Sequence, residues 1–359
     1  MKCCVNCFND NELKSIIYQF GEIGDCDFCN SHNVSVYDID KDDIIGNYML
    51  DILEIYTIKD YLPHTFPKEK LSSLYNILKN KWHIFNSDKT DIHALIKELC
   101  KNKYAKIDDI FAQPVGIKEE MLLEYLDKHS IMRNHTWTDF VEAIKYKNRF
   151  HLDYINLEEL GKLLTYTEIQ VSKNNHFYRA RICKNKEALD ITEMGAPPAN
   201  LSVAGRANSE GISCLYLANE IETTFYEIRA ILYDFVCVAT FKPIKDLKII
   251  DLSNISGISP FLDSLDYTEY AINIETLNKI GQDLAKPVRR HDSKLDYLPT
   301  QYISDFIKSL GYDGIKYKST LSEKGYNLTI FNPSLFEYAK KEVEVFEIKS
   351  IDYRYEKIN

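Results

Sequence analysis

The sequence contains no run of about 18 apolar residues, the length that a membrane-spanning helix requires. The best candidate, ILYDFVCVATF at 231–241, is interrupted by Asp234 and is too short. The first residues, MKCCVNCFND, lack the apolar core of a secretory signal. Internal repeats and low-complexity linkers are missing too. We therefore expect a cytoplasmic globular protein that makes no membrane contact.

An excess of positive charge is also missing. The 359 residues include 44 Lys and Arg against 54 Asp and Glu, which gives a formal net charge of −10. This balance argues against broad binding of nucleic acid, because such binding depends on neutralising phosphates. The nearest thing to a basic patch is KPVRRHDSK at 286–294, which we interpret as a solvated loop.

Nine cysteines in a chain without a secretory signal favour metal binding or simple burial over disulfides. Two C-x-x-C units, Cys4–Cys7 and Cys26–Cys29, are separated by eighteen residues. Two such turns supply the four sulfur ligands that zinc binds in a tetrahedron. With all four ligands from the protein, the metal has no open coordination position for a substrate or water. The spacing predicts a structural zinc site. A redox pair or unrelated buried thiols are the alternatives.

We also make predictions for other residues near this motif and for the remaining cysteines. We expect Gly21, Gly24 and Asn30 to supply the positive backbone angles of the turns, and Cys3 to be a spare for Cys4. The remaining cysteines lie in apolar segments and are predicted to be core residues: Cys100, Cys183, Cys214 and Cys237. No Cys/His pairing indicates a nucleophilic thiol.

The hydrophobic pattern from about residue 70 to 165 is helical. Residues 92–99 place apolar side chains at i, i+3, i+4 and i+7, with a capping residue at Asp91 or just before it. A second helix is expected after Asn156, which forms a capping-box pattern with Glu159. These apolar stripes indicate the core of a helical domain.

After about residue 170 the pattern changes to short β-rich runs with a few helices between them. The helices are expected near 220–231, 267–285 and 300–310. Because strands outnumber helices and do not alternate strictly with them, the sequence predicts a mixed α+β domain. The predicted strands are 176–182, 214–218, 235–244, 247–253, 314–319, 327–332 and 342–355.

These changes divide the chain into four parts. Residues 1–35 form the predicted cysteine knuckle and residues 36–168 a helical domain. Residues 169–345 form the predicted mixed-sheet domain, and residues 346–359 a final strand and tail.

Polar side chains of particular kinds lie at the ends of several of these segments. Arg179 and Arg206 each offer a planar fork of donors that matches phosphate and ribose hydroxyls. Tyr216 on a strand can stack on an aromatic ring, and Glu227 on a helix can stabilise an oxocarbenium-like transition state. The set suits an anionic, ribose-containing ligand. Surface ion pairs and a core tyrosine are the structural alternative.

The order of the motifs from 176 to 335 resembles the RES-domain family, named for its arginine, glutamate and serine. The motifs are Tyr178-Arg179, the GR-x-N block at 205–208, LYLA at 215–218, Glu227, TQ-x-I at 300–303, GYDGI at 311–315, Ser319 and Asn327. Ala207 occupies the position where the family often has tryptophan, and Arg181 competes with Arg179 for the first arginine role.

The resemblance implies a fold similar to ADP-ribosyltransferases and NAD as the substrate. It assigns NAD binding to Arg179, Arg206, Asn208, Tyr216 and Ser319. It assigns catalysis to Glu227, with Arg179 and Tyr216 in support. Family members act as toxins, usually beside an antitoxin, so the resemblance also implies a cognate antitoxin or, alternatively, an activating defence partner.

Three functions follow as hypotheses. The first is a toxin or effector that cleaves the nicotinamide–ribose bond of NAD by hydrolysis or phosphorolysis. The second is a mono-ADP-ribosyltransferase that uses the same site on a protein acceptor. The third is a nucleotide-binding sensor without turnover. The sequence leaves a homo-oligomer open.

The helical segment resembles the HEPN-like region found ahead of some RES domains. HEPN ribonucleases have a histidine about one helical turn after an arginine, and neither Arg133 nor Arg149 has one at that spacing. We therefore expect this segment to be regulatory.

Overall fold

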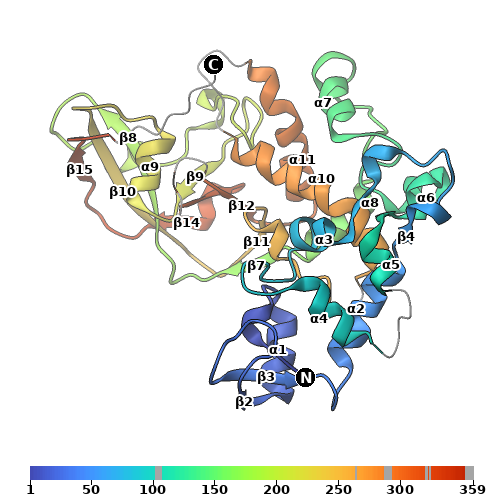
Figure 1. Ribbon diagram of the computed structural model, residues 1–359. Coiled ribbons are helices and arrows are strands. Elements are labelled where there is room, and N and C mark those ends of the chain that lie inside the picture. Colours follow the sequence, from blue (N-terminus) through green and yellow to red (C-terminus); the bar gives the residue numbers. More distant parts are fainter. Residues whose placement is uncertain (102–106, 263–264, 287–292, 320–321, 323–324, 352–359) are drawn as a thin grey trace. The chain divides into compact units, whose positions relative to one another are not determined.

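Figure 1 shows the computed structural model, which describes residues 1–101, 107–262, 265–286, 293–319, 322 and 325–351. Most of the basic stretch at 286–294 and the end of the predicted tail lie outside the described residues. The chain forms two compact units. We call Met1–Thr136, Tyr154–Glu159 and Ser256–Leu277 the knuckle unit, and Trp137–Asp153, Leu160–Ile255 and Asn278–Asn359 the sheet unit. Residues 137–153, which the sequence places in the helical segment, therefore cluster with the sheet.

The knuckle unit begins with a small antiparallel sheet of order β1-β3-β2. Its elements are β1 (Lys2–Cys4), a 3-10 turn (Val5–Cys7), α1 (Asn11–Phe20), β2 (Glu22–Gly24) and β3 (Val34–Asp38). The side chain of Asp10 accepts a hydrogen bond from the backbone N–H of Leu13 and caps α1. This cap fixes where the helix starts after the first cysteine turn.

The expectation about backbone angles is right for one residue of three. Asn30 has a φ of 55°, as expected for the second cysteine turn. Gly21 instead has a φ of −87°, and Gly24 is not among the positive-φ residues. Gly21 is needed for space, because a Cβ there would lie 2.3 Å from the carbonyl oxygen of Ile17.

The rest of the knuckle unit is mainly helical. The helix at 92–99 forms as predicted, and Asp91 caps it by accepting from the N–H of Ala94. A three-stranded sheet of order β4-β6-β5 was not predicted, since strands of two or three residues have no readable period. The elements are α2 (Ile44–Glu54), β4 (Thr57–Ile58), β5 (Ser72–Ser73), α3 (Leu74–Asn76), a π-helix (Ile77–Trp82), α4 (Ile92–Leu99), α5 (Ile107–Ala112), β6 (Pro114–Gly116) and α6 (Leu123–His129).

The sheet unit is built on one mixed sheet, to which nine described strands belong. The order is β14-β10-β8-β9-β13-β12-β11-β7, with β15 also paired to β10. Only β11 and β12 run parallel among these described pairs. The strands are β7 (Glu168–Val171), β8 (Phe177–Cys183), β9 (Leu215–Ala218), β10 (Phe235–Pro243), β11 (Leu247–Asp251), β12 (Gly314–Lys318), β13 (Tyr326–Ile330), β14 (Phe336–Tyr338) and β15 (Glu344–Glu347).

Five helices complete the chain, and the predicted α+β class is confirmed. They are α7 (Trp137–Tyr146), α8 (Leu157–Thr165), α9 (Ile221–Glu227), α10 (Tyr267–Ala285) and α11 (Leu298–Ser309). The described 3-10 turns elsewhere are Lys59–Tyr61, Lys68–Lys70, Lys118–Met121, Ile191–Met194, Ala199–Leu201, Ile255–Gly257, Lys294–Tyr297 and Pro333–Leu335. Asn156 caps α8 through the N–H of Glu159, as its sequence predicts.

Two apolar clusters hold the sheet. The larger lies on one face and includes Phe177, Leu217, Ile249 and Leu328. On the other face, α9 packs its apolar residues against β8 and β10, next to Ala180 and Val238 (Figure 1). Helix α9 is thereby fixed beside β8, and this position decides where its last residue, Glu227, lies.

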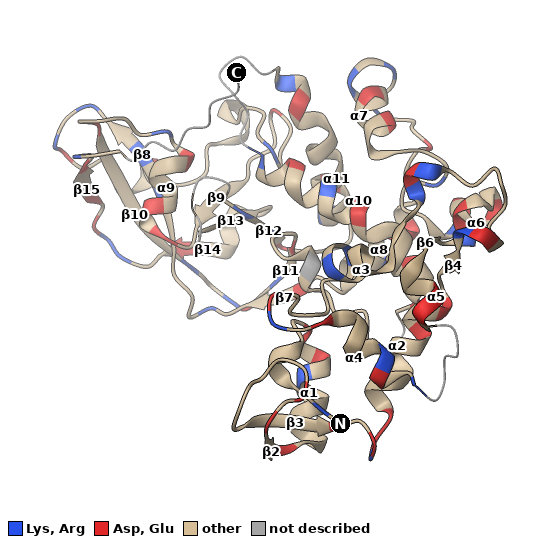
Figure 2. Cartoon of the chain, viewed as in Figure 1, with Lys and Arg blue, Asp and Glu red and all other residues tan. Residues whose placement is uncertain are grey.

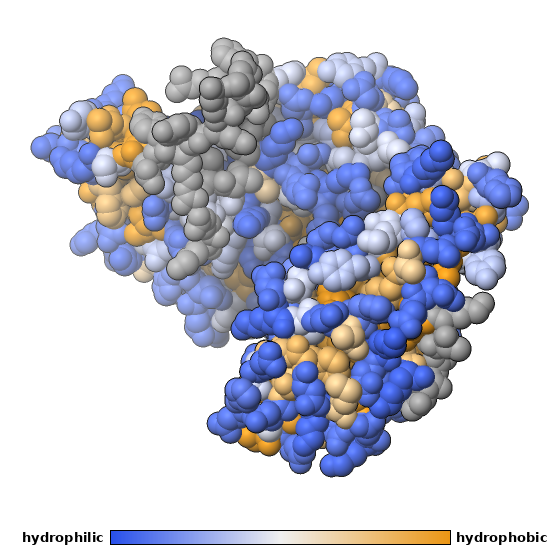
Figure 3. All heavy atoms as spheres, viewed as in Figure 1, coloured by the Kyte–Doolittle hydropathy of each residue, from blue (hydrophilic) through white to orange (hydrophobic). Residues whose placement is uncertain are grey.

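The surface of the protein carries charges of both signs, as the amino-acid composition predicts. Lys residues are interspersed with Asp and Glu on helices such as α4 and α7 (Figure 2). The face shown in Figure 3 is mainly hydrophilic, with smaller hydrophobic areas between the polar residues. Among the described helices, none combines the length and the apolar character that crossing a membrane would require.

Replacing Gly21 by alanine should loosen the knuckle. The new Cβ would lie 2.3 Å from the oxygen of Ile17 and 2.5 Å from that of Val36, both of them backbone atoms. We expect a loss of about 1–3 kcal/mol and faster hydrogen–deuterium exchange in peptides covering 22–38. Gly24→Ala is the control, because its Cβ meets only the side chain of Val36, at 3.1 Å. Unchanged exchange in Gly21→Ala would contradict this account.

Candidate functional site

Strands β8 and β9 are neighbours in the sheet but pair at a single position, Tyr178 with Ala218. Beyond that position the two strands separate, and a cavity of 320 Å³ lies at the gap. Its lining residues are Tyr178, Arg179, Ala180, Gly205, Arg206, Tyr216, Leu217, Ala218, Thr224, Glu227, Ile228, Tyr297, Tyr317 and Asn327. We call this the arginine cavity. All of these residues belong to the sheet unit.

Strand register decides which side chains share a face at this gap. Ala218 pairs with Tyr178 and with Asn327, and Asn327 pairs with Tyr317. Cross-strand partners lie on one face, and residues two apart in a strand do too. Tyr216, Asn327 and Tyr317 therefore lie on the face that α9 covers. Arg179 lies on the opposite face and approaches the cavity through the gap.

Arg179 makes one hydrogen bond at the gap. Its Nη1 donates to the backbone carbonyl of Tyr216 at 3.3 Å. Its Nε is buried and has no hydrogen-bond partner within the described structure. Burial, followed by the neighbouring charge of Arg181, lowers the pKa of Arg179 to about 10. This guanidinium is therefore a desolvated positive charge that an anion would stabilise.

Arg181 has the same orientation on β8 but different surroundings. Its Nη2 donates to the carbonyl of Gly195 at 3.2 Å, and it does not line the arginine cavity. Of the two competing arginines, the structure therefore brings Arg179 to the cavity.

Glu227 occupies the end of α9, at the centre of the polar groups of the cavity. Asn327 Nδ2 donates to its Oε1 at 2.7 Å, and Arg206 Nη2 lies 3.5 Å from its Oε2. The Glu227 side chain is 25% exposed and that of Arg206 is 15% exposed. One carboxylate oxygen is held firmly, while the other has only a loose ion pair. Glu227 is thus oriented and still open to a ligand.

The loop that carries Arg206 is fastened by Tyr216 and Asn208. Tyr216 donates through its hydroxyl to Asn208 Oδ1 at 2.6 Å and accepts from the N–H of Ala207 at 3.1 Å. Burial raises the pKa of Tyr216 well above its ordinary value, so the hydroxyl keeps its proton. A Cβ at Gly205 would lie 2.7 Å from the Tyr216 hydroxyl oxygen, so a larger residue there would push this hydroxyl away from its partners.

Helix α11 fastens the same loop from a second direction. Thr300 Oγ1 donates to the carbonyl of Arg206 at 2.7 Å. Gln301 Nε2 donates to the carbonyls of Gly205 at 2.8 Å and Asn208 at 2.9 Å. The TQ-x-I motif therefore serves to position Arg206.

The predicted site residues differ in where they lie. Arg179, Arg206, Tyr216 and Glu227 all line the arginine cavity. Asn208 does not line it: its amide Nδ2 donates within the loop to the carbonyls of Val203, Ser209 and Ile212. This geometry fits a loop-positioning role. Ser319 is 1% exposed and is not a lining residue either.

Sequence reasoning gave no role in the site to several lining residues, among them Tyr297 and Tyr317, and it named Asn327 only as a motif position. Tyr317 is 2% exposed, and burial raises its pKa to about 12, so it contributes a neutral hydroxyl. The sequence shows Asn327 within a strand, but only the register with Tyr317 and the approach of α9 reveal its contact with Glu227.

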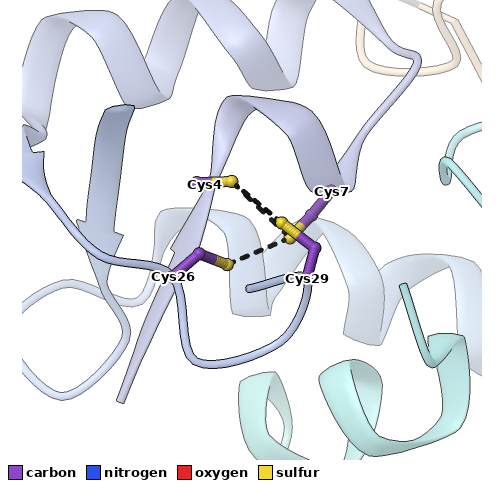
Figure 4. Close-up of side chains that lie close together, drawn as sticks. All are labelled: Cys4, Cys7, Cys26 and Cys29. Atoms are coloured by element: carbon purple, nitrogen blue, oxygen red, sulfur yellow. Dashed lines mark hydrogen bonds between the residues drawn. The ribbon is translucent and has the colours of Figure 1, made fainter. Parts of the chain in front are cut away.

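The four cysteines of the two C-x-x-C units come together in the knuckle unit and point toward one another (Figure 4). Their sulfur atoms all lie within 4.8 Å of one another. Cys4 Sγ lies 3.3 Å from Cys29 Sγ, and Cys7 Sγ lies 3.5 Å from Cys26 Sγ. This candidate metal site combines the first cysteine turn with the loop between β2 and β3. Cys3 is fully buried outside the group.

The protein is thus an α+β protein with a polar cleft at a gap in its sheet. The family model described as "RES domain" matches residues 176–355, half of the chain, and the chain belongs to the RES domain family. The match contains every lining residue of the arginine cavity.

The comparison with solved structures gives a distant likeness. The crystal structure of the M. tuberculosis MbcT–MbcA toxin–antitoxin complex contains a chain that is 15% identical. The alignment covers 54% of this chain and 94% of that one, with a TM-score of 0.32. None of the curated proteins compared with the chain matches it in sequence.

Removing the hydroxyl of Tyr216 should release the Arg206 loop. Tyr216→Phe leaves the N–H of Ala207 and Oδ1 of Asn208 without their shared partner. We expect a loss of about 1–3 kcal/mol, seen as a lower unfolding midpoint and faster hydrogen exchange in 204–212. The control is Tyr178→Phe, because the Tyr178 hydroxyl makes no hydrogen bond with other described residues. Equal midpoints for the two variants would refute the fastening role.

Proposed function

We propose that the protein cleaves the nicotinamide–ribose bond of NAD in the arginine cavity and acts as an NAD-depleting toxin or effector. Membership of the RES domain family supports action on NAD in general. The observation that carries the specific reaction is the arrangement around Glu227. One oriented carboxylate faces a cavity that also contains two guanidinium groups.

The single carboxylate of the cavity suits cleavage of the nicotinamide–ribose bond. Among the described residues that line the cavity, Glu227 is the only carboxylate. Hydrolysis of an ordinary glycoside uses two, one of which protonates the leaving oxygen. The nicotinamide of NAD is a pyridinium, which leaves as a neutral ring when it takes the bonding electron pair. Such a leaving group needs no acid, so a single carboxylate is sufficient.

The proposed step develops positive charge on the ribose. The C–N bond breaks, its electron pair goes to the nicotinamide nitrogen, and an oxocarbenium-like carbon forms. Oε2 of Glu227, which is only loosely paired with Arg206, stabilises that charge, while Asn327 keeps the carboxylate oriented. Water or phosphate then forms the new C–O bond and loses a proton to solvent. Tyr216 and Tyr317 supply ring surface for the base.

The two arginines are proposed to hold the diphosphate and ribose. Arg206 also prevents Glu227 from being a buried, unpaired charge before the ligand arrives. Arg179 comes from the other face of the sheet and has a donor available, so we assign it an anionic oxygen of the ligand. Asn208 supports this binding set by shaping the loop. Ser319, which the family resemblance also assigns to NAD binding, is 1% exposed and lies outside the cavity lining, so we give it no direct contact with the ligand.

Two alternatives use the same cavity. A mono-ADP-ribosyltransferase would perform the same bond cleavage and pass the ribose to a protein side chain. A sensor would bind the dinucleotide without turnover. Glu227 favours turnover over simple sensing, because a carboxylate beside the ligand phosphates would weaken ground-state binding of an anion. A cognate antitoxin would restrain the toxin, whereas a defence partner would activate it, and we propose a regulatory role for the knuckle unit.

Glu227→Gln tests the proposed role of the carboxylate. The variant keeps the shape and can still contact Asn327, but it removes the negative charge. We expect kcat for nicotinamide release to fall about a hundredfold or more, with a smaller change in KM. Glu222→Gln, at the start of the same helix, is the matched control and should stay near the original rate. Near-normal turnover by a folded Glu227→Gln protein would remove the catalytic assignment.

We also propose that the four cysteines bind one structural zinc ion. Zinc at about 2.3 Å from each sulfur needs sulfur atoms about 3.8 Å apart in a tetrahedron. The sulfur separations of 3.3, 3.5 and 4.0 Å surround this value. Cys4, Cys7, Cys26 and Cys29 would be the ligands, and with four thiolates bound the metal would stabilise the fold without taking part in the reaction.

Cys26→Ser should release this metal. Loss of one thiolate opens the tetrahedral site, and the metal's contribution to folding is lost with it. We expect elemental analysis to find about one zinc per chain in the original protein and far less in the variant. Cys3→Ala, which changes a buried cysteine next to the cluster, is the control and should retain the metal. A freshly purified protein without zinc would end this proposal.

A further inference from the structure

A second cavity lies in the sheet unit, at the start of α11. It has a volume of 420 Å³, and its wall comes from α7, the end of α10 and the turn before α11. The charged and aromatic residues of its wall are Trp137, Lys145, Asp283, Lys286, Asp296 and Tyr297, so two lysines stand beside two aspartates. Helix α7 lies outside the residues that match the RES domain family. The part of the wall that α7 forms therefore comes from outside the matched domain, and the rest comes from within it.

The second cavity adjoins the arginine cavity. Tyr297 lines both of them. Thr300 lines the second cavity and donates to the carbonyl of Arg206, whose side chain lines the first. Arg206 Nη1 in turn donates to the carbonyl of Ala285 at 3.5 Å, and the next residue is Lys286. A ligand that follows Arg206 and crosses Tyr297 would thus enter the second cavity.

The lining of the second cavity matches a nucleoside phosphate. Lys145 Nζ lies 2.6 Å from Asp296 Oδ1, and its side chain is 15% exposed. The indole N–H of Trp137 donates to Asp283 Oδ2 at 2.7 Å, which fixes the ring at the wall. Lys286 is exposed on the same wall. Asp296 and Asp283 are already bound to Lys145 and Trp137, which leaves the exposed Lys286 as the cation for a phosphate. Trp137 and Tyr297 supply rings for a base.

We propose that the second cavity binds the adenosine monophosphate half of NAD, while the nicotinamide riboside half lies in the arginine cavity. This inference rests on the proposed function. A volume of 320 Å³ is at the lower limit for a drug-sized ligand, and a dinucleotide has two nucleosides joined by a diphosphate. Two adjoining compartments accommodate the two nucleosides. Tyr297 separates them, next to the path of the diphosphate.

The test compares NAD with nicotinamide mononucleotide, which has the same scissile bond but no adenosine monophosphate. Val141→Trp fills the second cavity, and Lys286→Ala removes a cation from its wall. In either variant we expect kcat/KM for NAD to fall about tenfold or more, mainly through KM. The value for nicotinamide mononucleotide should stay within about twofold. Lys308→Ala, which replaces an exposed lysine outside both cavities, should change neither value.

A binding measurement separates this inference from the proposed function. By titration calorimetry, adenosine monophosphate should bind the original protein and should bind Val141→Trp and Lys286→Ala about tenfold more weakly. Suppose that the original protein consumes NAD, but that the variants lose kcat/KM equally for both substrates or lose none for NAD. That result overturns the proposed role of the second cavity and leaves the proposed function standing. If the original protein leaves NAD intact, the proposed function fails, and the calorimetry decides the inference by itself. No binding of adenosine monophosphate overturns it.

Discussion

The site depends on the single residue pair that joins β8 to β9. In a continuous sheet these strands would satisfy each other's backbone groups and leave no room between them. Where they separate, the free carbonyl of Tyr216 needs a donor, and Arg179 supplies it from the opposite face. The same gap admits Glu227 from α9 and Arg206 from its loop. The interrupted pairing of β8 and β9 therefore creates the cavity and also brings the charge of Arg179 to it.

The charged side chains at the gap are only partly paired with one another. Glu227 has a loose partner in Arg206, and the charge of Arg179 is partly desolvated with no carboxylate beside it in the described chain. An anionic ligand would complete this arrangement, because it can take the donors of both arginines. Neutral hydroxyls of Tyr216 and Tyr317 keep the rest of the wall uncharged. This electrostatic pattern is what connects the fold to the proposed dinucleotide substrate.

Local patterns in the sequence predicted much of the fold. The helix at 267–285, the caps at Asp91 and Asn156, and the cysteine cluster all depend on residues close together in the chain or on fixed spacing. Strands β7 and β14 were not predicted, since three or four residues give too short a period. Four site residues were found through motif order, whereas the contact of Asn327 with Glu227 joins residues a hundred positions apart. Only sheet register creates that contact.

Product analysis of the original protein tests the central claim most directly. Purified protein is incubated with NAD, with and without inorganic phosphate, and the products are identified by mass spectrometry. Cleavage at the ribose predicts free nicotinamide together with ADP-ribose, or with its phosphorylated form where phosphate is the acceptor. ADP-ribose found only on protein would favour the transferase alternative. NAD recovered intact under both conditions would contradict the account.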